Sequence, residues 1–257
     1  MKRGISNMAN QAVRKDLGNI QEMIRKQGVR KGQATIVDLI FVIDGTKSMQ
    51  NALDAAKNRA LTMYSDIVAG LAEYKRSVRK LRVKVIVFRD FYVDAVAYEE
   101  SDYFILNGQE NDDAIAFRDF IAGIRAMGGG DGPEHGLEAL HHAMKLDFTP
   151  CVEGQKARHI IVMMTDADAH PLNDVQRDWE ENRSVYPADM PRDLEGLQEE
   201  WESMDPSAKR LIIFAPNAYP WNILTAWNEV HHTPSQASMG ISEAVFQQVI
   251  SAISGSV

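Results

Sequence analysis

The sequence predicts an α/β fold of three layers, in which helices cover both faces of a mostly parallel sheet. Two nearly continuous apolar runs, at 35–43 and 159–164, have the length and composition of strands that are buried on both faces. Elsewhere, apolar residues recur at the three- and four-residue spacing of helices. With 257 residues and 45% hydrophobic content, the chain has enough material for one core, and one domain is the expectation.

The first half of the chain supplies five expected elements after the strand at 35–43. A long helix is expected over 49–74. The segment 81–91 alternates and is expected to pair with a short strand near 103–106, which gives the sheet one antiparallel edge strand. A second helix covers 112–127 and a third runs from 133 or 134 to 144. The buried side of the second helix is expected to carry Phe117, Phe120, Ile121 and Ile124.

The second half continues with the apolar strand at 159–164, a strand at 211–214 and a last amphipathic helix at 241–253. Between these strands, an acidic insertion at about 173–205 is longer than the ~2 to 6 residues of an ordinary connection. A helix is expected near 194–204. The insertion either forms one wall above a ligand site or is inert and packs Trp179 and Trp201 locally.

Charge separates a basic N-terminal extension from an acidic body. Residues 1–35 contain eight Lys or Arg and two acidic residues, so the net charge of −8 leaves −14 for the rest. Residues 1–34 are interpreted first as a helix that folds back on the body, second as a docking arm for a protein, and third as a nucleic-acid contact. An acidic body argues against a general nucleic-acid binder, because phosphates repel it.

The chain has the composition expected of a cytoplasmic protein. Its single cysteine, Cys151, excludes an internal disulfide. No stretch reaches the ~18 apolar residues that span a bilayer, so a membrane partner is not expected. The amino terminus carries charges where a signal peptide has an apolar run.

Three oxygen-bearing side chains follow the first strand at alternate positions: Asp44, Thr46 and Ser48. Carboxylate and hydroxyl oxygens suit a hard cation such as Mg²⁺, Mn²⁺ or Ca²⁺. The second apolar run leads to Asp166, and GGGDGPE at 128–134 precedes the third helix. Since ligands bind at the carboxyl ends of the strands in open α/β sheets, these loops are expected to meet around one ion.

With these motifs, the chain resembles a von Willebrand factor A domain over about residues 35–255, which implies a Rossmann-like doubly wound fold for a domain at 35–257. The turn DGTKS resembles the metal-ion-dependent adhesion site of that family, whose usual pattern is Asp-x-Ser-x-Ser. Thr46 stands in the first Ser position and Asp166 in the third-loop position. FRDFYVD, GGGDGPE and TDADAH are similar to stand-alone bacterial and alpha-kinase-associated members.

The second loop departs from the family, because it has no Thr and Asp131 is the nearest oxygen ligand. If Asp131 binds directly, three carboxylates over-neutralise a dication and weaken its pull on an acidic group. If Asp131 or Glu134 acts through water, the ion keeps an open position. Two further residues are expected around the ligands. His170 matches a His of the related branch, and Asp90 either forms an ion pair with its neighbour Arg89 or binds a metal-bound water.

The resemblance implies a non-catalytic interaction module in which an acidic side chain of another protein completes the shell of the ion. For stand-alone bacterial members it implies a scaffold or regulator beside kinases, phosphatases or ATPases, including stress-response and phage-defence systems. The motifs lack a positioned base, a Lys clamp or a nucleophile, so an enzyme is not expected. The alternative is a metal-dependent phosphohydrolase that uses Asp131 or Glu134 as a base.

Overall fold

The computed structural model describes residues 35–60, 62, 66–67, 69, 78–106, 111–130, 132–153 and 155–234. The predictions for the basic extension at 1–34 and for the last helix at 241–253 lie outside these residues. Much of the second half of the helix expected at 49–74 lies outside them as well. No helix in the described segments is long and apolar enough to cross a bilayer.

A seven-stranded sheet forms the middle layer, with the order β3-β2-β1-β5-β6-β7 and with β4 paired to β2. Five strands are parallel, and the short β3 and β4 both run antiparallel to β2. The predicted mostly parallel sheet with antiparallel pairing at its edge is therefore confirmed. The strands are β1 (Thr35–Asp44), β2 (Val78–Phe88), β3 (Tyr98–Glu100), β4 (Phe104–Leu106), β5 (Lys156–Met164), β6 (Lys209–Ala215) and β7 (Val230–Pro234).

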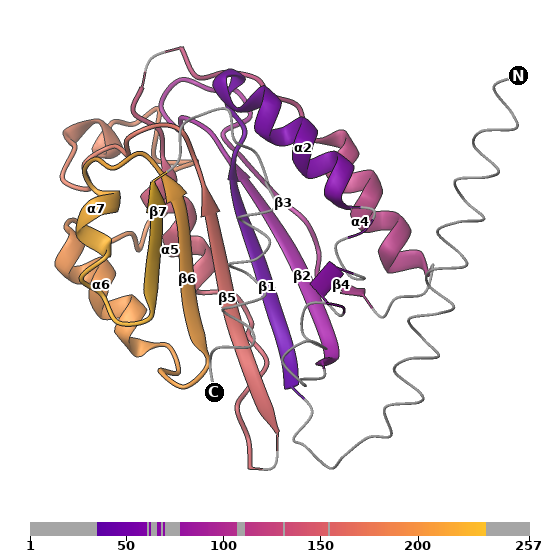
Figure 1. Cartoon of the computed structure of the whole chain (residues 1–257). Coiled ribbons are helices and arrows are strands. Elements are labelled where there is room, and N and C mark those ends of the chain that lie inside the picture. Colours follow the sequence, from indigo (N-terminus) through magenta and orange to yellow (C-terminus); the bar gives the residue numbers. More distant parts are fainter. Residues whose placement is uncertain are drawn as a thin grey trace, which may run out of the picture.

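Helices cover both faces of this sheet (Figure 1), which makes the three predicted layers. On one face, α2 and α4 pack against each other, and on the other face α5 contacts β1, β2 and α6. The helical elements are η1 (Lys47–Met49), α2 (Gln50–Ala60), α4 (Asp112–Gly123), α5 (Gly136–Met144), η2 (Val175–Asp178), α6 (Leu194–Ser203) and α7 (Trp221–Leu224).

Alternate residues of the central strands enter two different cores, one on each face of the sheet. In β1, Leu39 and Phe41 belong to the core under α2 and α4, whereas Ile40 and Val42 belong to the core under α5, α6 and α7. Both sets are buried. A strand with no solvent-facing side must be apolar throughout, which explains the continuous hydrophobic run in the sequence.

The helix α4 begins as predicted but ends earlier. The Asn111 side chain accepts the N–H of Ala114 and so caps its first turn. The helix ends at Gly123 instead of Met127, because the next residues leave it to join the β1 loop. There the N–H of Met127 donates to the carbonyl of Gly45, at 2.9 Å.

The helix α5 begins at Gly136, two residues later than the latest predicted start, Glu134. Glu134 instead forms an isolated parallel bridge with Ala169, and its N–H donates to the carbonyl of Asp168 at 2.9 Å. A main chain that pairs with another loop is not free to take helical dihedral angles. This pairing places the Glu134 side chain at the end of the sheet instead of in a helical turn.

The acidic insertion packs onto the face that carries α5. The guanidinium of Arg177 donates to the carbonyls of Leu172, Pro191 and Met190, which closes the insertion on itself. Trp201 of α6 is completely buried, whereas Trp179 is 49% exposed. Trp201 belongs to the core on this face and donates its indole N–H to the carbonyl of Asn228, outside the insertion, so the alternative in which both tryptophans pack locally is wrong.

Candidate metal centre

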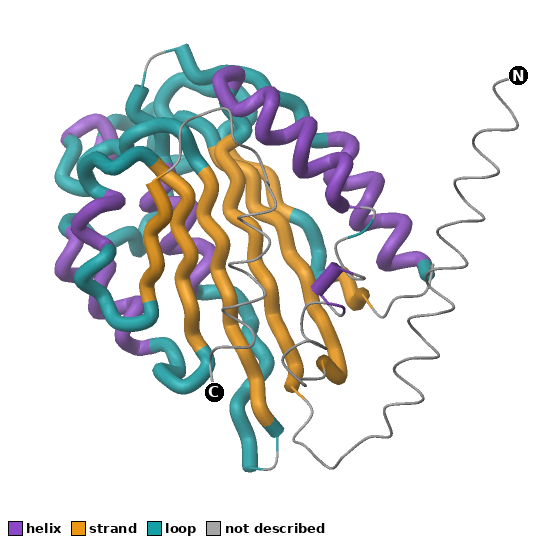
Figure 2. Tube along the Cα trace, in the orientation of Figure 1, coloured by secondary structure: helices purple, strands orange, loops and turns teal. Residues whose placement is uncertain are grey.

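The parallel strands all end at one edge of the sheet, where the loops cluster (Figure 2). Asp44 is the last residue of β1 at this edge, and it is fully buried. One carboxylate oxygen, Oδ1, accepts the N–H of Thr46 at 2.9 Å and the Thr46 hydroxyl at 2.6 Å. The other, Oδ2, accepts the hydroxyl of Thr165 at 2.7 Å. The carboxylate is therefore held by donors from two separate loops.

A continuous line of close oxygen–oxygen contacts extends from Asp44 to the third loop. The Thr46 hydroxyl lies 3.2 Å from the Ser48 hydroxyl, which donates to Asp166 Oδ1 at 2.9 Å. The structure thus brings together four of the five predicted ligands, including two that lie 118 positions apart. All of their side-chain donors and acceptors are oxygen atoms.

Burial raises the pKa of Asp44 to about 6, which hydrogen bonds from Thr46 and Thr165 oppose and the nearby charge of Asp166 reinforces. Desolvation acts here because an ionised carboxylate loses its hydration inside the protein. A bound cation would restore the missing electrostatic stabilisation and lower this pKa again. The ligand set is all oxygen, and its Asp44 carboxylate forms no ion pair with a residue in the described part of the chain, which fits a hard divalent ion such as Mg²⁺.

The glycine-rich loop comes close to Thr46. Gly128 and Gly129 have φ values of 70° and 66°, which favour glycine. A Cβ on Gly129 would lie 2.7 Å from Thr46 Cβ and 3.1 Å from Glu134 Oε1, so this glycine fits between the two side chains. Its N–H donates to Asp94 Oδ2 at 3.2 Å.

The second-loop oxygen that the structure describes at the site belongs to Glu134. Its side chain is buried and lines the cleft beside Ser48 and Asp166. The predicted ligand Asp131 lies outside the described residues. The sequence indicates Glu134 only as an alternative that acts through water. It is the carboxylate of the loop at 128–134 that the structure describes beside the predicted ligands.

The second and third loops are fixed to each other and to the core. The N–H of His170 donates to the carbonyl of Glu134 at 3.0 Å. The indole of Trp221 donates to the carbonyl of Ala167 at 2.9 Å. Trp221 is fully buried against Gly136, where a Cβ would come within 2.8 Å of the indole ring. The main chain around Asp166 is therefore held from two sides.

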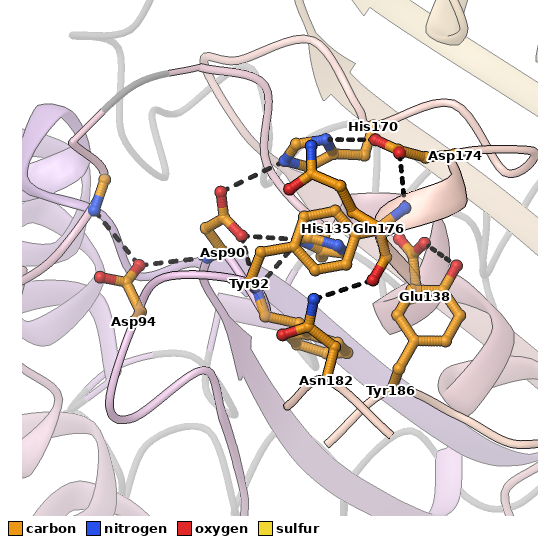
Figure 3. A network of polar contacts seen from close by, with 12 residues as sticks. Asp90, Tyr92, Asp94, His135, Glu138, His170, Asp174, Gln176, Asn182 and Tyr186 are labelled. Atoms are coloured by element: carbon orange, nitrogen blue, oxygen red, sulfur yellow. Dashed lines mark hydrogen bonds and ion pairs between the residues drawn. The ribbon is translucent and has the colours of Figure 1, made fainter. Parts of the chain in front are cut away.

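Beneath these loops, Asp90 joins two histidines (Figure 3). Its Oδ2 lies 3.2 Å from His170 Nε2, and its Oδ1 lies 3.3 Å from His135 Nδ1 and accepts the N–H of Tyr92 at 2.6 Å. Burial opposes ionisation of Asp90, but the histidine contacts and the N–H of Tyr92 outweigh it and hold the pKa of Asp90 below its usual range.

The expected ion pair between Arg89 and Asp90 is wrong. Arg89 instead pairs with Glu99 at 2.8 Å and donates to the carbonyls of Gly45, Val96 and Arg125. A guanidinium carries donors on three nitrogens, so one buried Arg89 connects the β1 loop, the β2–β3 connection and the segment after α4. It fixes the loops, as the sequence suggested, through different partners.

Sequence reasoning missed Thr165 and His135. Thr165 directly precedes Asp166, and a hydroxyl that follows a buried strand is the signal that could have identified it. His135 follows Glu134 in the sequence, but only the tertiary structure places it against Asp90 and His170.

The loops enclose an open cleft of about 690 Å³. All charged residues that line it are acidic, namely Glu134, Asp166 and Asp168, and Tyr219 and Pro171 contribute apolar surface. None of these lining residues belongs to the insertion at 173–205, so the alternative in which the insertion forms a wall of the site is not supported. The lining residues that the structure describes are Ser48, Gly129, Gly130, Gly132, Pro133, Glu134, Asp166, Ala167, Asp168, Ala169, Pro171 and Tyr219.

Solved structures with a related fold include a pilus adhesin, SpaC from Lactobacillus rhamnosus GG. It matches with a TM-score of 0.52 and 10% identity over 89% of this chain and 31% of the adhesin. Proximal thread matrix protein 1 from the mussel byssus matches with a TM-score of 0.42 and 15% identity over 86% of this chain and 49% of that protein. The chain thus spans less than a third of the adhesin, and the likeness shows the α/β fold alone.

No protein-family model matches the sequence, and no curated protein matches it significantly.

Proposed function

We propose that this chain is a non-catalytic, metal-dependent protein-binding module of the von Willebrand factor A type. One observation carries the proposal, namely the line of oxygen ligands from Asp44 through Thr46 and Ser48 to Asp166, beside an open cleft. A Mg²⁺ or Mn²⁺ ion held there would keep a position for an oxygen of a partner. In this proposal the protein is cytoplasmic and bacterial.

The partner offers an acidic side chain. The cleft has only acidic charges among its lining residues, so without a cation it repels a carboxylate. With a dication at the oxygen ligands, the open position of the ion offers a partner carboxylate a direct bond that the acidic lining alone does not provide. Recognition would therefore depend on the metal, as expected for a scaffold beside a kinase, phosphatase or ATPase of a stress-response or antiviral system.

Phosphoester hydrolysis is the weaker alternative. Glu134 lies in the cleft and has the chemistry of a general base. A phosphoryl group, however, carries negative charge on its oxygens and is usually held by Lys or Arg in addition to metal. Among the described residues, the cleft lining contains neither Lys nor Arg and presents three carboxylates instead.

Partner capture from the native host tests the proposal. The tagged chain is purified in Mg²⁺ or in chelator, as wild type, Asp44→Ala and Ser48→Ala, and the associated proteins are compared. We expect one set of partners to be lost with chelator and in both variants. Capture that persists in all three conditions contradicts the proposal.

Asp38→Asn is the matched control. Asp38 is as buried as Asp44 and lies on the same strand, but it is bound to Thr149 and Arg82 away from the cleft. Its replacement disturbs a buried carboxylate without touching the oxygen ligands. We expect Asp38→Asn to keep its Mg²⁺-dependent partners at temperatures where it is folded. A panel of phosphoesters with Mg²⁺ or Mn²⁺ tests the alternative, and turnover lost in Glu134→Gln would favour it.

A further inference from the structure

Asp90, His135 and His170 form a second group of possible metal ligands, separate from the oxygen ligands of the cleft. They come from three segments: the turn after β2, the residue before α5 and the loop after β5. One ligand atom of each lies within 4.8 Å of those of the other two. Asp90 and His135 are buried, and His170 is 12% exposed.

The spacing of these atoms is that of ligands around a small ion. Bonds of about 2.0–2.2 Å in a tetrahedral zinc site place neighbouring ligand atoms about 3.4 Å apart. Asp90 Oδ1 lies 3.3 Å from His135 Nδ1 and Asp90 Oδ2 lies 3.2 Å from His170 Nε2, so each oxygen of the carboxylate is about this far from one imidazole nitrogen. Among the described residues, no Lys or Arg forms an ion pair with Asp90, and its carboxylate contacts the two imidazoles and the N–H of Tyr92.

The two histidines present the nitrogen atoms that such an ion needs. His170 faces Asp90 with Nε2, while its Nδ1 lies 3.8 Å from Asp174 Oδ2 (Figure 3). A carboxylate near the outer nitrogen is a common way to orient a metal-bound imidazole. For His135, Nδ1 accepts the N–H of Phe91 at 2.9 Å, and the buried Nε2 has no hydrogen-bond partner in the described part of the chain. An ion either displaces the Phe91 N–H or binds through Nε2.

We propose that Asp90, His135 and His170 bind a divalent transition-metal ion of the Zn²⁺ class, with water at the remaining position. Two imidazoles and one carboxylate suit Zn²⁺, whereas the oxygen ligands of the cleft suit Mg²⁺ or Mn²⁺. A metal-bound imidazole nitrogen must be deprotonated, so a proton on the ligating nitrogen passes to solvent when the ion binds.

An ion at this position would join the loops that carry the oxygen ligands. His135 is next to Glu134, and the N–H of His170 is bound to the carbonyl of Glu134. Asp94, whose N–H donates to the Asp90 carbonyl, accepts the N–H of Gly129. The inference does not rest on the proposed function, since it concerns different ligands and a different class of ion.

Cobalt binding to the full chain tests the second site. Metal-free protein is titrated with Co²⁺ in excess Mg²⁺, which occupies the oxygen ligands, and visible absorption is recorded. We expect one equivalent of Co²⁺ to give the intense bands of a four-coordinate ion with nitrogen ligands, and Zn²⁺ to abolish them. A wild-type protein that gives no such bands overturns the proposal, whatever the variants do.

Variants assign the ligands. His170→Gln and Asp90→Asn should each lower the Co²⁺ affinity by at least about 100-fold. Asp44→Ala, in the oxygen site, and His231→Gln, an exposed histidine of β7, should keep the bands. Unchanged affinity in both Asp90→Asn and His170→Gln contradicts the proposal.

If these variants unfold, the NMR spectrum of the wild type with Co²⁺ decides instead. Ring-proton signals of two histidines shifted by the ion support the site, and a spectrum with no shifted histidine signal overturns it. Asp44→Ala also separates this site from the proposed function. We expect this variant to lose its Mg²⁺-dependent partners and to keep the Co²⁺ bands.

Discussion

The hydroxyl of Thr165 and the carboxylate of Asp44 lie 121 positions apart in the chain and 2.7 Å apart in the structure. The bond crosses from β5 to β1, which are neighbouring parallel strands that end at the same edge of the sheet. It holds the Asp44 carboxylate from the side opposite Thr46, so both ends of that group are fixed before any ion binds.

Replacing Thr165 by Val tests this bond, because Val keeps the shape and removes the hydroxyl. Asp44 Oδ2 then loses its buried donor, which should lower the free energy of unfolding by about 1–3 kcal/mol in chelator. Thr165→Ser, which keeps the hydroxyl, is the control and should lose much less. Urea unfolding of both proteins measures the difference, and equal losses in Val and Ser would contradict the prediction.

Stability without metal should depend on pH through Asp44. Its pKa rises from 3.8 to about 6 on folding, so the folded state holds the proton more tightly than the unfolded state. The contribution of Asp44 to stability is therefore best below about pH 4 and falls as the pH rises to about 6, by about 3 kcal/mol at most. Above pH 6 it stays at this lower level.

Asp44→Asn isolates this effect, since Asn cannot ionise. In chelator, the stability of the variant relative to wild type should increase between about pH 4 and pH 6 and then level off. Asp90, whose pKa is lowered, contributes stability that is lost on acidification in both proteins, so it cancels in the comparison. A difference that does not change with pH would show that burial of Asp44 has no such cost.

Mg²⁺ should stabilise the wild-type protein and not Asp44→Asn. At a concentration about 100 times the dissociation constant, binding adds about 2.7 kcal/mol to the free energy of unfolding. For a chain of this length, that corresponds to a rise in melting temperature of roughly 5–10 °C. Thermal unfolding at neutral pH with Mg²⁺ or with chelator measures it, and an equal rise in both proteins would place the ion elsewhere.

Gly129→Ala should damage the site, whereas Gly130→Ala should not. A methyl at 129 meets Thr46 Cβ at 2.7 Å, and alanine is strained at a φ of 66°, whereas a methyl at 130 has nothing within 4 Å. We expect a loss of about 2–4 kcal/mol for Gly129→Ala from strain and overpacking together. Mg²⁺ affinity should fall as well, because Thr46 must move. Calorimetry of the two alanine variants compares them directly.

Much of the fold follows from the sequence because burial on both faces forces a continuous apolar strand. That rule located β1 and β5, and helical spacing located α4 and α6 within a few residues. Local patterns did not reveal the short elements β3, β7 and α7. The strands β3 and β7 take their place from pairing with longer neighbours. Likewise, no local pattern indicates that α5 begins at Gly136 instead of at Glu134. The bridge between Glu134 and Ala169 determines this later start.

The sequence by itself determined that Asp44, Thr46 and Ser48 follow a buried strand at alternate positions, because a turn of five residues is a local feature. Only the tertiary structure decided which distant groups meet them. Thr165, Asp166 and Glu134 arrive from loops whose positions depend on strand order, and His135 reaches Asp90 through the packing of α5. Contacts between segments far apart in the chain are set by the packing of the whole core, and the spacing of residues within one motif does not encode them.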